Sequence, residues 1–320
     1  MIKKIINKKI IKIKNYDFLF LKFFIIIIYI YLNALILNKK IRHKIQVCIC
    51  SIGKKENLYI REYIEYYKNL GVDKIYIYDN NEINGEAFET VIYDYIKINY
   101  VNIINYRGYH RPQRKMMNNC YKMNYLKYDW LIFIDLDEFL YLKNYSNIKN
   151  FLNEPKFNNC KKIYLNYVFY TDNNNVYYEN KTLMERFKET FLYKVYWGKT
   201  IIRGNISGIN ITSVHYITGK VPACNGFGKK SKQFNLDSKY YYFKHYSFKS
   251  TEELCNKLNR GNADFENSYQ KKINKIYMYF TYNKITIQKI EIIENKTGIK
   301  LDNLRNKLKN KKYKITKKLF

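Results

Sequence analysis

The segment DWLIFIDLDEFL, residues 129–140, decides the fold class of this chain. Its first half runs from Trp130 to Ile134 and is wholly apolar, which is typical of a strand buried in an α/β sheet. Asp135, Asp137 and Glu138 follow directly, and acidic residues at the carboxyl end of such a strand project into the crevice where these folds bind ligands. Two Asp one residue apart point the same way off an extended backbone, so both are expected to face one divalent cation.

A D-x-D triplet after an apolar strand is typical of two classes of enzyme. Phosphatases and phosphotransferases with an aspartyl nucleophile need a small Thr or Val at the fourth position after the first Asp, where this chain has Phe139. Glycosyltransferases of GT-A fold use the triplet to hold Mn²⁺ or Mg²⁺ under the diphosphate of a sugar nucleotide. The sequence favours the second class, and a solvated acidic turn is the remaining alternative.

A strand, a helix and a second strand are predicted before the triplet. Residues 45–50 (IQVCIC) alternate as a buried strand, and residues 58–71 place apolar and aromatic side chains at helical spacing before Gly71 as a C-cap. Residues 73–81 (DKIYIYDNN) form another alternating strand, which contains Asp79 at its end. This order predicts the beginning of a parallel α/β sheet. Asp79 then lies where a ribose or base could be hydrogen-bonded, and an Asx turn is the alternative.

These residues carry a resemblance to a known family. The run KKENLYIREYIEYYKNLGVDKIYIYDNN, residues 54–81, resembles the opening of glycosyltransferase family 92 and of related family-2-like bacterial domains. The chain departs from the family pattern at Tyr67, where His is common, and at residues 170–174, where the loop usually bears Gly and Ser. Several ordered blocks are more specific than any single motif. Further family-like blocks extend the match over about residues 44–264: Gln113 and Cys120, the D-x-D segment, LMERF (183–187), KTIIR (199–203), His215-Tyr216, and HYSFKSTEELCNKLNRGNAD (245–264).

The resemblance implies an α/β fold of GT-A type, with a mostly parallel sheet flanked by helices, over residues 44–264. It also implies a metal-dependent glycosyltransferase that uses Mn²⁺ or Mg²⁺ and transfers a sugar, with inversion, from a nucleotide-sugar donor to a glycan, protein or lipid acceptor. The alternative is a catalytically degenerate GT-A scaffold that acts as a basic, membrane-tethered binding protein.

The resemblance further implies roles for individual residues. Asp137 would coordinate the metal directly, and Asp135 would contact it through water or touch the donor ribose. The third ligand would be His245, with His215 as the alternative. Glu185 in LMERF would be the base that deprotonates the acceptor hydroxyl, unless it forms a salt bridge to an arginine. The donor-binding residues implied are Glu56, Asp79, Gln113, Asp135, Lys249 and Arg260, with surface solvation as the alternative for the two cations.

The composition limits the partners and cofactors. The net charge is +31, but the excess is mostly Lys and comes with abundant Asn, Ile and Tyr, so codon bias explains it and no specific nucleic-acid partner is predicted. Six scattered Cys show no C-x-x-C or other paired spacing, so neither a zinc site nor a disulfide framework is indicated. Cys48 and Cys50 are expected to be buried as small hydrophobic residues.

The two ends of the chain differ from the central domain. Residues 1–17 are basic, and residues 18–37 form an apolar run, interrupted by Lys22 and Asn33, that is long enough for a transmembrane helix. We therefore expect a single-pass membrane protein, with an amphipathic or buried helix as the alternative. Residues 265–320 are expected to form a basic helical extension that covers one edge of the core or lies on an anionic membrane surface.

Overall fold

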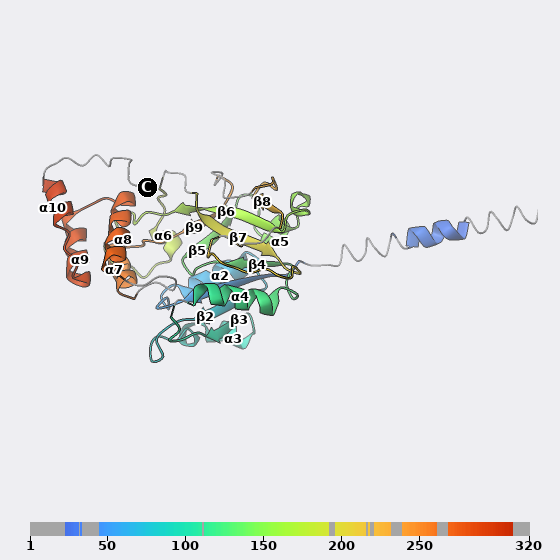
Figure 1. Cartoon of the computed structure of the whole chain (residues 1–320), viewed down its shortest axis with the longest axis horizontal. Coiled ribbons are helices and arrows are strands. Elements are labelled where there is room, and N and C mark those ends of the chain that lie inside the picture. Colours follow the sequence, from blue (N-terminus) through green and yellow to red (C-terminus); the bar gives the residue numbers. More distant parts are fainter. Residues whose placement is uncertain are drawn as a thin grey trace, which may run out of the picture. The chain divides into compact units, whose positions relative to one another are not determined.

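A computed structural model of the chain describes residues 23–31, 33, 45–110, 112–191, 196–215, 217, 221–231, 239–260 and 268–309. The chain divides into two compact units, Met1–Ile45 and Gln46–Phe320. The second unit carries the sheet, the core and every site residue discussed below (Figure 1).

In the first unit, residues 23–31 and 33 are helical. The remainder of the expected membrane segment 18–37, and the basic segment 1–17, lie outside the described residues. Across the described ranges, no helix has both the length and the apolar character that a membrane crossing requires. This finding contradicts the predicted membrane helix and single-pass location.

One mixed, mostly parallel sheet forms the centre of the second unit, as the sequence predicted. Its strand order is β3-β2-β1-β4-β7-β6-β9-β5, and β8 pairs with β6 beside this path. The pairs among β1 to β4 are parallel, and β7 joins them antiparallel to β4. The strands are β1 (Val47–Gly53), β2 (Lys74–Asp79), β3 (Val101–Asn105), β4 (Trp130–Phe133), β5 (Glu138–Leu142), β6 (Lys162–Phe169), β7 (Gly198–Arg203), β8 (Ala223–Asn225) and β9 (Tyr241–His245).

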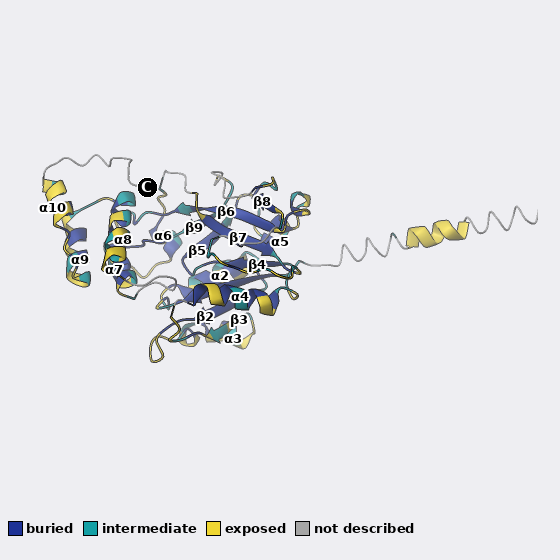
Figure 2. Ribbon diagram, viewed as in Figure 1, coloured by how far each residue is buried: buried dark blue, intermediate teal, exposed yellow. Residues whose placement is uncertain are grey.

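Helices α2 (Ile60–Asn69) and α4 (Gln113–Asn124) cover opposite faces of β1. Alternate side chains of a strand point to opposite faces, so Cys48 and Cys50 join a core cluster with α4. On the other face, the Ser51 hydroxyl lies 2.6 Å from the Tyr63 hydroxyl of α2. β1 is therefore buried on both sides, as are most residues of β2 and β4, which Figure 2 shows in dark blue. This burial explains their largely apolar sequences.

Two disulfides correct the prediction drawn from the cysteine spacing. Cys50 of β1 is bonded to Cys120 of α4, and Cys160 is bonded to Cys224 of β8. The partners are 70 and 64 residues apart in sequence, so only the fold brings them together. Cys48 is free and buried, as expected, whereas Cys50 is buried in a disulfide rather than as a free thiol.

The helices at the carboxyl end pack onto the core through a buried ion pair. Asp172 accepts hydrogen bonds from Lys289 Nζ, at 2.5 Å, and from the Tyr279 hydroxyl. Asp172 belongs to the segment 170–174 that departs from the family pattern, so this segment holds the helical extension in place. The remaining helices are α3 (Glu89–Lys97), α5 (Ile148–Leu152), α6 (Leu183–Arg186), α7 (Thr251–Arg260), α8 (Tyr269–Tyr282), α9 (Ile287–Thr297) and α10 (Asp302–Lys309), with a 3₁₀ turn, η1, at Pro155–Phe157.

Candidate active site

A pocket lies where β1 and β4 end, which is the edge at which an α/β sheet binds ligands. The loop after β1, the acidic turn after β4, the end of β9 and the helices α7 and α8 all contribute to its wall. The lining residues are Ile52, Gly53, Lys54, Glu56, Asn80, Gln113, Asp135, Leu136, Asp137, Val214, His215, His245, Ser247, Lys257, Arg260 and Lys275.

The two Asp of the triplet both line the pocket but have different hydrogen-bond partners. β4 ends at Phe133 and residues 136–137 form a turn, in which the Glu138 N–H donates to the Asp135 carbonyl oxygen at 3.1 Å. The expectation that both carboxylates face one cation assumed an extended backbone, which the turn replaces. Asp135 accepts from Gln113 Nε2 at 2.9 Å and from Lys199 Nζ at 3.1 Å.

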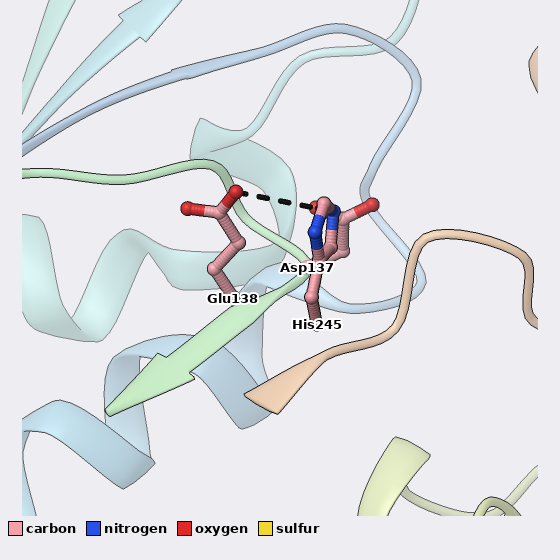
Figure 3. Close-up of side chains that lie close together, drawn as sticks. All are labelled: Asp137, Glu138 and His245. Carbon is pink, nitrogen blue, oxygen red and sulfur yellow. Dashed lines mark ion pairs between the residues drawn. The ribbon is translucent and has the colours of Figure 1, made fainter. Parts of the chain in front are cut away.

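Asp137, Glu138 and His245 form a group of possible metal ligands (Figure 3). The antiparallel pairing of β5 with β9 sets Glu138 opposite His245. His245 Nε2 lies 3.6 Å from Asp137 Oδ1 and 3.9 Å from Glu138 Oε1, and the ligand atoms of all three lie within 4.8 Å of one another. These separations are too long for hydrogen bonds. Three donors that converge without bonding one another fit a divalent cation between them.

Burial and neighbouring charge set the ionisation of this group. Burial lowers the pKa of His245 to about 3, so its imidazole is neutral at pH 7, as a metal ligand must be. Burial alone would raise the pKa of Asp137, but the positive charge of Lys257 holds it well below its usual range. Burial raises the pKa of Glu138 well above its usual range, against the opposing charge of Lys199. A bound cation would favour the ionised form of Glu138.

His215 lines the same pocket but is not part of this group. Its Nδ1 lies 3.1 Å from the carbonyl oxygen of Gly198, to which a protonated Nδ1 donates. Its ring is 5.2 Å from that of Trp197, an exposed residue directly before β7. Of the two histidines considered for the metal, the structure therefore brings only His245 to Asp137.

Glu56 and Arg260 form an ion pair in the lining of the pocket. Arg260 donates to the Glu56 carboxylate and, through Nη1, to the carbonyl oxygen of Lys55 at 3.0 Å. Lys249 Nζ reaches the second oxygen of Glu56 at 3.2 Å and is buried. Glu56, Arg260 and Gln113 thus line the pocket as expected, whereas Lys249 lies behind Glu56 and outside the lining.

Asp79 and Glu185 are not among the described residues that line the pocket. The Asp79 carboxylate accepts from the Asn81 N–H at 2.9 Å and from Arg107 Nε at 2.8 Å, so both of its oxygens are used locally. Glu185 is exposed, and its carboxylate accepts from the Thr182 N–H at 2.8 Å and from the Thr182 hydroxyl at 2.7 Å. These contacts close a capping box at the start of α6.

Four residues near the acidic turn were missed as site residues in the sequence. Glu138 directly follows the triplet, and Lys199 and Lys257 stand within family-like blocks, so each carried a signal. Lys257 Nζ donates to Asp137 Oδ2 at 2.6 Å. Lys275 lines the pocket from α8 and lies in a Lys-rich segment where nothing distinguishes it from its neighbours.

Solved glycosyltransferase structures resemble the chain only at a low level. A mannosyltransferase from Pyrobaculum calidifontis, in complex with GDP-Man and Mn²⁺, matches with 9% identity and a TM-score of 0.30, over 39% of this chain and 36% of that one. TarS of S. aureus, in complex with UDP-GlcNAc, matches with 10% identity and a TM-score of 0.38, over 79% of this chain and 80% of that one. Similarity this low assigns no ligand to the present chain.

Plant proteins of one family match part of the sequence more closely. A glycosyltransferase family 92 protein of Oryza sativa subsp. japonica is 29% identical over 117 residues, which are 36% of this chain and 20% of the relative. One of Arabidopsis thaliana is 29% identical over 104 residues, which are 32% of this chain and 18% of the relative. The matched stretch therefore spans about a fifth of the length of these relatives.

The family model of glycosyltransferase family 92 matches residues 43–280, which is most of the chain. The matched region runs past residue 264, where the resemblance in the sequence stopped, and takes in Lys275. The prediction made from the ordered sequence blocks is confirmed, and the chain belongs to glycosyltransferase family 92.

Proposed function

We propose that this chain is a metal-dependent glycosyltransferase that transfers a sugar, with inversion, from a nucleotide-sugar donor to a glycan, protein or lipid acceptor. One observation carries the proposal: Asp137, Glu138 and His245 converge at a pocket at the strand ends of a family 92 chain. Cationic side chains on α7 and α8 line the same pocket, which suits the diphosphate of such a donor.

Asp137, Glu138 and His245 would hold the metal, Mn²⁺ or Mg²⁺. Two carboxylates with one neutral imidazole suit Mn²⁺ better, because Mg²⁺ prefers oxygen ligands. A divalent cation held there would neutralise the charge that develops on the departing nucleoside diphosphate. Asp135, which Gln113 and Lys199 hold in place, is left to contact the donor ribose.

The donor diphosphate would lie against Arg260 and Lys275. Arg260 is anchored by Glu56, and Glu56 is anchored by Lys249, so these two residues fix the guanidinium at the wall of the pocket. In this proposal Glu56 and Lys249 act by positioning Arg260. Asp79 accepts a hydrogen bond from Arg107 at the end of β2. The residue that follows Asp79 in sequence, Asn80, lines the pocket.

The family resemblance assigns the catalytic base to Glu185. Its carboxylate would have to leave the Thr182 cap to receive the acceptor proton. Glu185→Gln tests the role, because Gln can also close a capping box but cannot take a proton at neutral pH. Loss of about a hundredfold or more in turnover, with unchanged stability and donor KM, would support Glu185 as the base. Unchanged turnover would show that Glu185 is not the base and serves only in the capping box of α6.

The decisive experiment is an assay of the purified protein with a panel of UDP- and GDP-linked sugars. Release of nucleoside diphosphate should depend on added Mn²⁺ or Mg²⁺ and stop when EDTA is present. Asp137→Asn should abolish it, while Glu179→Gln at an exposed ion pair should not change it. Turnover that persists in EDTA would refute the metal dependence. Nucleotide binding without any turnover would instead support a degenerate scaffold.

A further inference from the structure

Each carboxylate around the pocket already has a positive partner before any ligand binds. Glu56, Asp135, Asp137 and Glu138 each lie within 4.0 Å of a cationic side chain, and their partners are Lys199, Lys249, Lys257 and Arg260. Four carboxylates thus face four cations, and Lys275 adds a further basic group at the wall.

This pairing of carboxylates with cations affects the binding of a divalent cation. A site that attracts a cation by itself carries surplus negative charge, whereas here each carboxylate already has a positive partner. Adding two positive charges to a partly buried cluster whose carboxylates are already paired with cations is unfavourable unless negative charge enters with them. The diphosphate of a nucleotide supplies that charge.

Lys257 is the partner that bears most directly on the metal ligands. Its ammonium lies 2.6 Å from Asp137 Oδ2 and 3.2 Å from the carbonyl oxygen of Ser247, and its side chain is only 14% exposed. Asp137 Oδ1 faces His245, so the cation would bind within a few ångströms of the Lys257 charge. Lys199, Lys249 and Arg260 pair with the other carboxylates of the pocket. Among these four cations, Lys257 is the one paired with Asp137.

We propose that this pocket binds its divalent cation together with a nucleoside diphosphate rather than in advance of it, and that Lys257 enforces this order. The inference rests on the proposed function, since it concerns the cation of the same site. Without nucleotide, Lys257 neutralises Asp137 and repels the metal. When a diphosphate enters, its oxygens offer the Lys257 ammonium a second anionic partner, and Asp137 becomes available to the cation. Lys257 is therefore a positioning residue that couples the two ligands.

The first test measures Mn²⁺ binding to the wild-type full chain by electron paramagnetic resonance, alone and with UDP or GDP. Titrations of each nucleotide without protein correct for the Mn²⁺ that it binds in solution. We expect the affinity of the protein for Mn²⁺ to rise about tenfold or more in the presence of a nucleotide that binds. Mn²⁺ binding that is equally tight without either nucleotide would overturn the proposal.

The second test uses Lys257 variants in the absence of nucleotide. Lys257→Met should bind Mn²⁺ about tenfold more tightly than wild type, because the repelling charge is gone. Lys257→Arg should behave as wild type, and adding Asp137→Asn to Lys257→Met should remove the gain. Lys181→Met, at an exposed ion pair, is the matched control. Equal or weaker Mn²⁺ binding by Lys257→Met would refute the role of Lys257.

These outcomes are separate from those of the transfer assay. Failure of the proposed function would appear as absence of turnover with every sugar nucleotide. Failure of this inference would appear as Mn²⁺ binding that depends neither on nucleotide nor on Lys257. If Lys257→Met does not fold, as judged by its thermal transition, the wild-type titration decides the matter alone.

Discussion

His245 Nε2 lies 3.6 Å from Asp137 Oδ1, although the two residues come from distant parts of the chain. The relationship follows from the sheet: β5 and β9 pair antiparallel, with Glu138 opposite His245, and Asp137 immediately precedes β5. The acidic turn and the histidine are therefore held by backbone hydrogen bonds rather than by a flexible loop. A site built on strands in this way keeps its ligands in place before the cation arrives.

The two histidines of the pocket should differ in their effect on metal binding. With nucleotide present, His245→Ala should weaken Mn²⁺ binding by about a hundredfold or more, because it removes a direct ligand, whereas loss of a group that only supports a ligand costs about tenfold to a hundredfold. His215→Ala is the matched control, since it lines the same pocket without joining the ligand group. Titration of Mn²⁺ against both variants measures the difference. A larger loss in His215→Ala would reverse the assignment.

Lys275 should make donor binding depend on pH near neutrality. The pKa of Lys275 is lowered to about 7. Burial is the main cause, and the positive charge of Lys257 adds to it, while the negative charge of Asp137 opposes it to a smaller extent. Its ammonium is thus protonated below pH 7 and loses its charge above, so affinity for a diphosphate should fall as pH rises from 6 to 8. Lys275→Arg, which stays charged, should remove this dependence.

Dissociation constants for UDP and GDP at each pH, with Mg²⁺ held constant, test the expectation. Protonation of the nucleotide itself is the same in assays of both proteins. The difference between the pH profiles of wild type and Lys275→Arg therefore reports the ionisation of Lys275. Parallel pH profiles for the two proteins would rule Lys275 out.

The sequence was informative wherever a local pattern determined the structure. The apolar run from Trp130 ends at the pocket because a buried parallel strand must deliver its following residues to that edge of the sheet. The prediction that Asp135 and Asp137 point the same way assumed an extended backbone, whereas the Glu138 N–H donates to the Asp135 carbonyl oxygen, and both residues nonetheless line the pocket.

Relationships that depend on three-dimensional packing were beyond the reach of sequence patterns. Lys257 stands in a family-like block, but only the packing of α7 shows that its ammonium donates to Asp137. The Cys50–Cys120 disulfide joins a strand to a helix on one face of the sheet, and no spacing rule encodes that pairing. The family resemblance supplied His245 because it carries long-range information that a single sequence does not.

The buried pair of Arg186 and Glu253 should contribute strongly to stability. Arg186 Nη1 lies 2.7 Å from Glu253 Oε2, and both side chains are almost fully buried. Glu253→Gln would leave the guanidinium charge without its carboxylate, which costs about 3–5 kcal/mol in the free energy of unfolding. Glu179→Gln, in an exposed pair with Lys181, should change it by less than about 1 kcal/mol.

Acid should weaken the same pair. Burial opposes ionisation of Glu253, but the hydrogen bonds from Arg186 and its other donors lower its pKa. Its contribution is therefore present above the unfolded pKa of about 4.3 and is lost as pH falls through the lower folded value. Urea denaturation of wild type and Glu253→Gln at several pH values measures this. A stability difference that stays constant between neutral pH and pH 3 would contradict the linkage.

Tyr67, where the family commonly has His, supports the strand that carries the acidic turn. Its hydroxyl donates to the Glu138 carbonyl at 2.9 Å and accepts from the Leu140 N–H at 2.9 Å, in a fully buried position. Tyr67→Phe would leave a buried carbonyl and a buried N–H without partners, so we expect a loss of about 2–4 kcal/mol in unfolding free energy. Tyr93→Phe, at an exposed position of α3, should stay within about 0.5 kcal/mol of wild type.

The Tyr67 variant should also affect the site, because Glu138 is one of the three grouped ligands. Releasing its carbonyl loosens the first residue of β5, so Mn²⁺ binding measured with nucleotide should weaken together with stability. Tyr67→His tests the origin of the effect: an imidazole that restores one of the two backbone contacts should fall between Phe and wild type in both measurements. If Tyr67→Phe lowers stability but leaves Mn²⁺ affinity unchanged, the tyrosine supports the strand alone, and the position of Glu138 does not depend on it.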